Sequence, residues 1–181
     1  MQYRTLSNGV ELPMIGYGTF QIRDAAQCEQ CVTNALEAGY RLFDTAASYE
    51  NEAAIGMALR SSGLPREELF ITTKLWVQDA GYDGTLRAFD ASLKRLGLDI
   101  LDLYLIHQPF GDYYGAWRAM ERLYREGAVR AIGVSNFNPH HVDELLAYAR
   151  IKPVVNQIKI HPYMEHQEVV GNTFAKGIQV Q

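Results

Sequence analysis

The sequence predicts an α/β fold in which a parallel β-sheet is surrounded by helices. Short apolar runs alternate with longer segments of helical period along nearly the whole 181-residue chain. A glycine follows several of the helical segments, as is common where a helix ends. Repeated strand–helix units of this kind form parallel sheets with right-handed crossovers. Two architectures meet the pattern: a doubly wound open sheet and a (β/α)8 barrel.

The first element is a β-hairpin. Residues 3–12 read YRTLSNGVEL, and polar and apolar residues alternate on both sides of Asn8-Gly9. Asn-Gly between alternating segments is the strongest short-range signal for a hairpin turn. The N-terminal segment therefore predicts a hairpin that precedes the sheet.

The strands follow as short apolar runs, and the last of them is only the beginning of a strand. They are predicted at residues 14–18, 40–44, 69–76, 100–107, 128–135, 152–160 and 178–181. The run at 178–181, IQVQ, has the β-branched alternation of a strand and comes directly after Gly177.

Helices are predicted between these strands. They cover residues 24–39, 51–63, 85–97, 113–127, 138–149 and 165–177. The third has the clearest period, because Leu86, Phe89, Leu93 and Leu96 recur at spacings of three and four. The fifth begins at a natural cap, Asn138-Pro139. The chain thus supplies six strand–helix units and the start of a seventh strand.

The loop after the first strand argues against a dinucleotide-binding Rossmann fold. Residues 16–24 read GYGTFQIRD, with glycines only at positions 16 and 18. The Rossmann fingerprint GxGxxG requires three glycines, the third of which allows the helix to pack closely on the strand. A Rossmann-type dehydrogenase is therefore disfavoured.

The composition indicates a globular protein and excludes several classes. The chain is 48% hydrophobic and 21% charged with a net charge of -4, so it offers no basic surface for nucleic acid. Its apolar runs are too short to span a membrane, and MQYRTLSNGV lacks a secretory signal. We expect a cytoplasmic enzyme or binding protein.

The two cysteines, Cys28 and Cys31, have the CxxC spacing of redox and metal pairs. They lie in the middle of a predicted helix, and no second pair of ligands is near. We interpret them as reduced helix residues and predict no metal site.

Polar residues stand where the strands end. In chain order they are Asp44, Lys74, His107, the pair Ser135 and Asn136, and Gln157. Each has an ordinary alternative, such as a helix cap for Asp44 or a surface position for Lys74. In a parallel barrel, however, all these strand ends open on one face, where the side chains would converge. Tyr49 would lie just above them.

The grouping suggests a proton donor. A buried lysine needs a partner, and Asp44 is the obvious one for Lys74. A free tyrosine has a pKa of about 10, and a nearby ammonium lowers it. Such a phenol can protonate an alkoxide that forms from a carbonyl. No side chain supplies a hydride, so a nicotinamide cofactor is required, and Ser135, Asn136 and Gln157 offer groups suited to its carboxamide.

At this level of detail the chain resembles the bacterial-type aldo-keto reductases. The matching motifs occur in the order of that family: GYGTF (16–20), FDTAASYENEAAIG (43–56), TTKLW (72–76), DLYLIHQP (102–109), IGVSNF (132–137) and VNQIKIHPY (155–163). The resemblance implies a single (β/α)8 barrel domain with an N-terminal hairpin that closes its bottom. It also implies NADPH-dependent reduction of aldehydes and ketones, with a small-molecule carbonyl substrate and, for the full-length protein, a monomer.

The resemblance also assigns roles to residues. Asp44, Tyr49, Lys74 and His107 would be the catalytic tetrad, with Tyr49 as the proton donor. Ser135, Asn136 and Gln157 would hold the nicotinamide, and Gly18, Thr19 and Asp44 would lie along the rest of the cofactor. Phe20, Trp76 and Gln108 would line the substrate pocket.

The chain departs from the family at a few places. Glu50 replaces a common glycine, and Gln108 stands where tryptophan is frequent. An aromatic residue that stacks on the nicotinamide and a basic segment for the 2′-phosphate have no match within 181 residues. Because a barrel needs eight strands, we expect the biological protein to be longer by about 80–110 residues, or its open edge to be covered by another chain.

A second function remains open. The same scaffold could serve as a non-catalytic nicotinamide-binding or regulatory subunit. The intact set of Asp44, Tyr49, Lys74 and His107 favours the enzyme.

Overall fold

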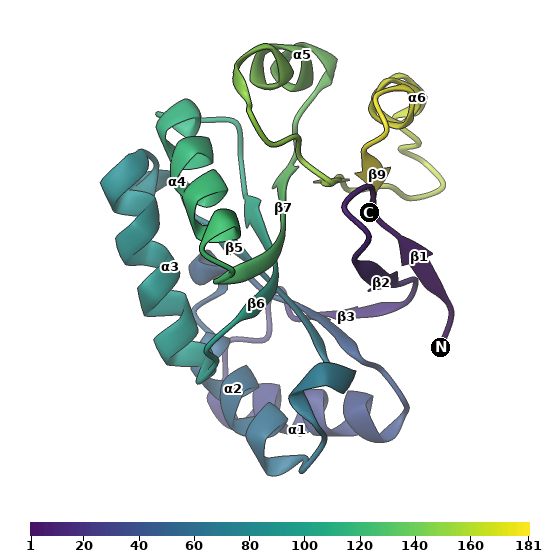
Figure 1. The fold of residues 1–181 in the computed structure, drawn as a ribbon. Coiled ribbons are helices and arrows are strands. Elements are labelled where there is room, and N and C mark those ends of the chain that lie inside the picture. The colour runs from purple at the N-terminus through teal and green to yellow at the C-terminus, as the bar shows by residue number, and fades with distance from the viewer.

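The computed structural model describes residues 1–181 and contains a curled, fully parallel sheet of seven strands (Figure 1). The strands are β3 (Gly16–Gly18), β4 (Leu42–Asp44), β5 (Phe70–Leu75), β6 (Leu101–Ile106), β7 (Val129–Ser135), β8 (Val155–Gln157) and β9 (Gln179–Val180). Each strand pairs with the next along the chain, from β3 to β9. A doubly wound sheet reverses its order at a switch point. The strand order therefore confirms the barrel architecture, of which the sheet forms a half-barrel.

Six helices connect the strands, as predicted: α1 (Ala25–Glu37), α2 (Glu52–Ser61), α3 (Tyr82–Leu96), α4 (Tyr113–Arg125), α5 (Pro139–Tyr148) and α6 (Gln167–Ala175). Three short 3₁₀ turns, η1 (Ala47–Tyr49), η2 (Arg66–Glu68) and η3 (Val77–Asp79), lie in the connections. The cap predicted for α5 is confirmed, because the Asn138 side chain accepts a hydrogen bond from the backbone of His141.

Some predicted boundaries were wrong. Helix α3 begins at Tyr82 rather than at residue 85, because Gly81 adopts a φ of 107° and its carbonyl accepts a hydrogen bond from the Thr85 hydroxyl. The strand predicted at 152–160 is confined to Val155–Gln157. There the ladder with β7 covers only two residue pairs.

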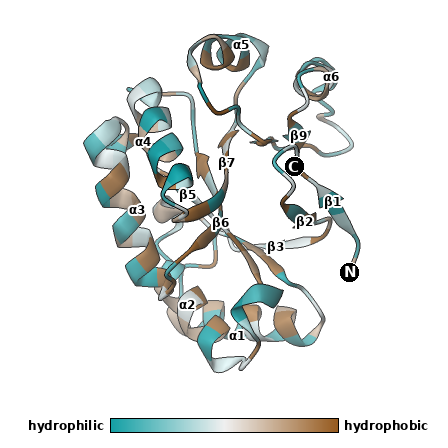
Figure 2. Cartoon of the chain, viewed as in Figure 1, coloured by the Kyte–Doolittle hydropathy of each residue, from teal (hydrophilic) through white to brown (hydrophobic).

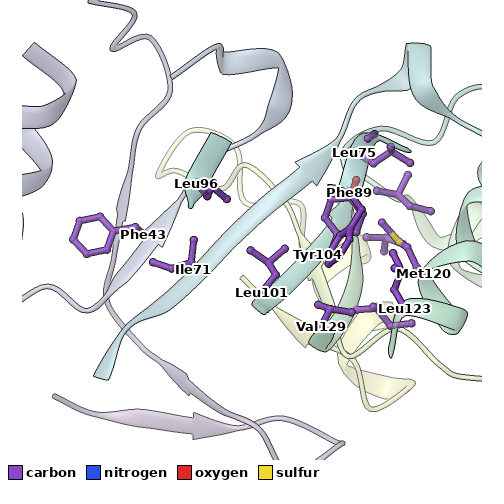
Figure 3. Packing of buried hydrophobic residues seen from close by; sticks show 14 of the residues in the cluster. Phe43, Ile71, Leu75, Phe89, Leu96, Leu101, Tyr104, Met120, Leu123 and Val129 are labelled. Carbon is purple, nitrogen blue, oxygen red and sulfur yellow. The ribbon is translucent and has the colours of Figure 1, made fainter. Parts of the chain in front are cut away.

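The main apolar layer lies between the strands and the helices. Figure 3 shows Phe43, Ile71 and Tyr104 from three neighbouring strands, packed beside side chains from α3 and α4. In Figure 2 the helices α3 and α4 carry both hydrophilic and hydrophobic residues, as expected of helices with one buried face. Burial of this layer fixes the helices on the outer side of the sheet.

A second, smaller apolar cluster fills the inner side of the sheet, and the predicted hairpin packs against it. Strands β1 (Tyr3–Thr5) and β2 (Glu11–Pro13) pair in antiparallel fashion. Leu6 and Leu12 of the hairpin pack with Leu42 and Phe70, at the beginnings of β4 and β5. The hairpin therefore closes the end of the half-barrel at which the strands begin.

Both cysteines are free thiols on α1. Cys28 is fully buried, and this burial raises the pKa of its thiol to about 11. A thiol with so high a pKa is a poor nucleophile, so Cys28 belongs to the packing of α1. None of the helices combines the length and the apolar composition that crossing a membrane requires.

Gly56 of α2 lies directly against Leu96, the last residue of α3. A Cβ atom at this position would lie 2.3 Å from the backbone oxygen of Leu96. Backbone cannot move aside as a flexible side chain can, so the close approach depends on glycine.

We expect Gly56→Ala to destabilise the fold by about 1–3 kcal/mol, the usual cost of overpacking a tight site. Gly171→Ala on α6 is the matched control, because a Cβ there meets no atom within 4 Å. That variant should gain up to about 1 kcal/mol from helix propensity. Urea unfolding of the two variants measures both changes, and equal stabilities would contradict the close approach.

Candidate active site

Strand alternation brings the polar strand-end residues to one mouth of the half-barrel. The apolar inner cluster contains Leu42, Leu105 and Val155. The residue two positions further along each strand faces the same side, because side chains alternate between the faces of a sheet. These residues are Asp44, His107 and Gln157. The convergence expected from the sequence is therefore present.

The centre of the site is a buried ion pair. The Lys74 side chain is 1% exposed, and its Nζ lies 2.5 Å from Asp44 Oδ1. Lys74 also donates a hydrogen bond to the carbonyl oxygen of Thr45, over 2.9 Å. Asp44 is thus the partner of Lys74, and the alternative that it caps a helix is wrong.

Tyr49 lies beside this ion pair. It ends the 3₁₀ turn η1, and its hydroxyl oxygen lies 3.4 Å from Lys74 Nζ. The same Nζ is 5.0 Å from the centre of the phenol ring, so the ammonium is nearest to the hydroxyl end. The ammonium therefore lies where it can stabilise negative charge on the phenol oxygen.

His107 completes the group. Its ring lies 5.7 Å from that of Tyr49, centre to centre, and its Nδ1 is 3.4 Å from the Ser48 hydroxyl. Burial, together with the nearby charge of Lys74, lowers the pKa of His107 to about 4. The imidazole is consequently neutral at physiological pH and can share a hydrogen bond without carrying charge.

Gln157 makes a contact that the sequence alone did not predict. Its Nε2 donates a hydrogen bond to Asp44 Oδ2 over 2.8 Å. Both carboxylate oxygens of Asp44 are therefore paired, one with Lys74 and the other with Gln157. Thr19 also joins this strand end, through hydrogen bonds from its backbone N–H and its hydroxyl to the Asp44 carbonyl.

Ser135 and Asn136 lie at the end of β7, next to His107. The Asn136 side chain donates hydrogen bonds of 3.0 Å to the His107 carbonyl and to the Ser135 hydroxyl. Asn136 itself has a φ of 62°, a left-handed conformation that asparagine tolerates better than most residues. These bonds fix the amide beside the histidine.

The three expected pocket residues differ in how closely they contact Tyr49 and His107. The ring of Phe20 lies 5.0 Å from that of Tyr49, and the ring of Trp76 lies 5.2 Å from that of His107. Gln108 follows His107, is half-buried, and its side chain makes no hydrogen bond within the chain. Phe20 and Trp76 thus flank the two polar rings, whereas Gln108 is placed near them only by its position in the chain.

Gly18 lies on the other side of the mouth, in register with Asp44 on the neighbouring strand. The two residues and Gln157 line part of a cavity of about 650 Å³ that opens along β3 and β9. A Cβ at Gly18 would meet no atom within 4 Å, so the backbone there is accessible.

Sequence reasoning missed four polar residues around Tyr49. Thr45 and Ser48 bond to Lys74 and His107, as described above, and the buried Asn51 and Glu52 begin helix α2. The sequence carried one signal for the last two: they end a run of three polar residues directly ahead of the apolar run AAIG. Their partners lie too far along the chain for that signal to identify them.

The arrangement provides proton-transfer chemistry. A buried ammonium, a phenol and a neutral imidazole face the same mouth, and they can stabilise negative charge on an oxygen atom placed between them. The described residues contain no group of three His, Cys, Asp or Glu side chains positioned to hold a metal ion.

Comparison with known proteins connects the geometry to a family. Residues 14–180 match the model of the aldo/keto reductase family. The chain is 50% identical over 177 residues to the glyoxal reductase of Bacillus subtilis, covering 97% of this chain and 64% of that protein. It is 48% identical over 164 residues to a 9,11-endoperoxide prostaglandin H2 reductase of Trypanosoma cruzi, covering 90% of this chain and 58% of the relative.

Solved structures agree with this match. An aldo/keto reductase from Brucella melitensis superimposes with a TM-score of 0.96 and 42% identity, covering 99% of this chain and 71% of that one. An aldo-keto reductase of Bombyx mori, crystallised in complex with NADP, superimposes with a TM-score of 0.95 and 36% identity, covering 99% and 65% of the two chains. The chain spans somewhat under two thirds of the length of the curated relatives given above. By its family match, its relatives and its fold, the chain belongs to the aldo/keto reductase family.

Proposed function

We propose that the protein reduces an aldehyde or ketone to the alcohol with NADPH, and that Tyr49 donates the proton. The observation that carries this proposal is the buried Lys74 ammonium, held 2.5 Å from Asp44 and 3.4 Å from the Tyr49 hydroxyl. A structural ion pair has no need of a phenol beside it. The names of the relatives support the same reaction class, since a glyoxal reductase acts on a carbonyl compound.

The residues near the mouth fit a nicotinamide carboxamide. The amide oxygens of Gln157 and Asn136 accept no hydrogen bond within the chain, although both side chains donate. Together with the Ser135 hydroxyl they offer acceptors and donors to a carboxamide. The cofactor supplies a hydride to the carbonyl carbon when it is bound. The Bombyx mori relative, which is bound to NADP, supports the choice of a phosphorylated dinucleotide.

The chain's own residues would handle the proton. The carbonyl oxygen lies between Tyr49 and His107, where the neutral imidazole orients it by a hydrogen bond. As negative charge develops on that oxygen, Tyr49 donates its hydroxyl proton, and Lys74 stabilises the phenolate that remains. Asp44 holds the Lys74 side chain in place through their ion pair. Solvent then returns a proton to Tyr49, so that one carbonyl, one NADPH and one proton yield one alcohol and one NADP⁺.

Tyr49→Phe tests the proton donor. In the full-length protein we expect kcat to fall by about 10²–10⁴-fold, the usual contribution of a general acid, with little change in NADPH affinity. Tyr3→Phe is the control, because Tyr3 is exposed on the hairpin at the opposite end of the half-barrel. Turnover of an aldehyde panel measures both. Near-normal turnover by Tyr49→Phe would refute the assignment, and NADPH binding by an inactive parent would favour a regulatory subunit.

Lys74→Met tests the coupling between the ammonium and the phenol. The variant leaves Asp44 without its charged partner and removes the group that favours the phenolate. We expect a lower kcat with little change in NADPH affinity. Lys152→Met, at an exposed position, should keep the parent's kcat. An unchanged kcat in Lys74→Met would argue against the coupling.

The lowered pKa of His107 predicts a pH dependence of stability. Its folded pKa is about 4, whereas an unperturbed histidine has a pKa of about 6.5. Between these values the unfolded chain binds more protons, so the stability that His107 contributes is complete above pH 6.5 and is lost as the pH falls toward 4.

Urea unfolding at pH 7 and pH 4.5 measures this effect. We expect His107→Gln to lose less stability than the parent between the two pH values, and His166→Asn, at an exposed position without an ion pair, to behave as the parent does. Equal losses in His107→Gln and the parent would contradict a neutral buried imidazole.

A further inference from the structure

Glu52 is a buried acid that the proposed reaction does not use. It is the first residue of α2, follows Tyr49 by three positions, and is 1% exposed. Its Oε1 accepts a hydrogen bond of 2.6 Å from the Thr73 hydroxyl. Its Oε2 accepts bonds from Arg95, at 2.7 Å from Nε, and from Ser92, at 3.3 Å. The carboxylate is therefore fully paired on the outer side of the sheet.

The Thr73 bond matters because Thr73 precedes Lys74. The two residues are consecutive on β5, so their side chains point to opposite faces. Lys74 faces the interior and its partner Asp44, while Thr73 faces Glu52 and the helices. A single carboxylate thus connects the helix that follows Tyr49 with the strand residue next to Lys74.

Asn51 holds the other side of the turn that joins Tyr49 to helix α2. It is 3% exposed, and its Nδ2 donates to the carbonyl oxygens of Thr19 and Ile22 over 2.8 and 3.0 Å. Its Oδ1 accepts from the Thr45 hydroxyl over 2.9 Å. The loop that carries Phe20 and the strand end at Asp44 are therefore joined to the residue that precedes Glu52.

Between Tyr49 and these two residues the backbone is strained. Glu50 has a φ of 60°, a left-handed conformation that is unfavourable for a residue with a Cβ. Such conformations persist where surrounding contacts over-determine them, often at functional sites. The side-chain bonds of Asn51 and Glu52 are the contacts that hold this turn.

We propose that Glu52 is a positioning residue, which holds the Tyr49 hydroxyl at the Lys74 ammonium through its bonds to Thr73 and Arg95. The proposal rests on the proposed role of Tyr49 as proton donor. Stability alone is a weak reason for a buried ionised acid, because replacing a buried ion pair by apolar side chains often leaves a fold equally stable. Proton transfer, in contrast, requires the donor to be placed to within a fraction of an ångström.

The chain offers a matched control in Glu121 of α4. Glu121 is 4% exposed, and its carboxylate accepts hydrogen bonds from the backbone N–H groups of Arg150 and Ile151 and from the Arg125 side chain. It is as buried and as well bonded as Glu52, but none of its bonds reaches a residue of the candidate site. Substitution of Glu121 therefore reports the purely structural cost of losing a buried carboxylate.

The experiment compares Glu52→Gln, Thr73→Val and Glu121→Gln in the full-length protein. Glutamine keeps the size of Glu52, but its amide nitrogen accepts no hydrogen bond, so either Thr73 or the pair Arg95 and Ser92 loses its acceptor. Valine keeps the size of Thr73 but donates no hydrogen bond. We expect Glu52→Gln and Thr73→Val to lower kcat by about tenfold to a hundredfold, with the Kd of NADPH changed less than about threefold. Thr73→Ser, which retains the hydroxyl, should keep a higher kcat than Thr73→Val. Glu121→Gln should keep the parent's kcat.

A second readout does not depend on activity. With 3-fluorotyrosine incorporated, the ¹⁹F resonance that is lost in Tyr49→Phe reports the surroundings of that ring. We expect it to shift or broaden in Glu52→Gln and Thr73→Val, and to stay unchanged in Glu121→Gln. If kcat and the resonance remain as in the parent in both variants, the positioning role is refuted while the proposed reaction stands. If the parent reduces no carbonyl compound, the proposed reaction fails, and the resonance alone decides whether Glu52 holds the Tyr49 ring.

Discussion

The positive charge of Lys74 inside the sheet is the constraint to which the rest of the site conforms. An ammonium removed from water loses several kcal/mol of hydration unless charged and polar groups replace it. Here the replacement comes from Asp44 at the end of the neighbouring strand and from the Thr45 carbonyl that follows it. Because Asp44 in turn accepts from Gln157 of β8, one buried charge links three strands of the half-barrel. Tyr49 and His107 are arranged around this pair.

The parallel sheet provides the frame for this charge through its alternation. On β5, Phe70 faces the interior among apolar neighbours near the hairpin, and Lys74, four residues later, faces the same side at the mouth. Residues of the other parity, such as Ile71 and Leu75, pack against the helices. Each strand thereby runs from the apolar core to the polar site within a few residues. Packing of the core therefore fixes the position of the charged groups along the strands.

The turn between β4 and α2 accommodates a departure from the family pattern. The resemblance leads one to expect glycine after the tyrosine, and the left-handed conformation at that position is one that glycine adopts without strain. Glu50 adopts it instead, with the buried side chains of Asn51 and Glu52 bonded on either side of the turn. The strained residue is exposed, while the residues that hold it are buried. Conformational strain and its compensation therefore lie within a few residues of the proposed proton donor.

The amino-acid sequence by itself determined the order of the elements, their parallel arrangement and the polar residues at the strand ends. Periodicity, glycine helix ends and caps such as Asn138 are local, so they could be read without knowledge of distant partners. The pairing of Asp44 with Lys74 could also be predicted, because a buried lysine requires an acid and only one stood at a neighbouring strand end.

The tertiary structure alone decided how the sheet curls and which side chains meet across it. Gln157 reaches Asp44 over 113 positions of sequence, and Arg95 reaches Glu52 over 43. The left-handed Glu50 likewise depends on surroundings that no local pattern describes. Such contacts are set by the packing of whole strands and helices against one another. For that physical reason the sequence located the site, whereas the three-dimensional fold identified the residues that hold it.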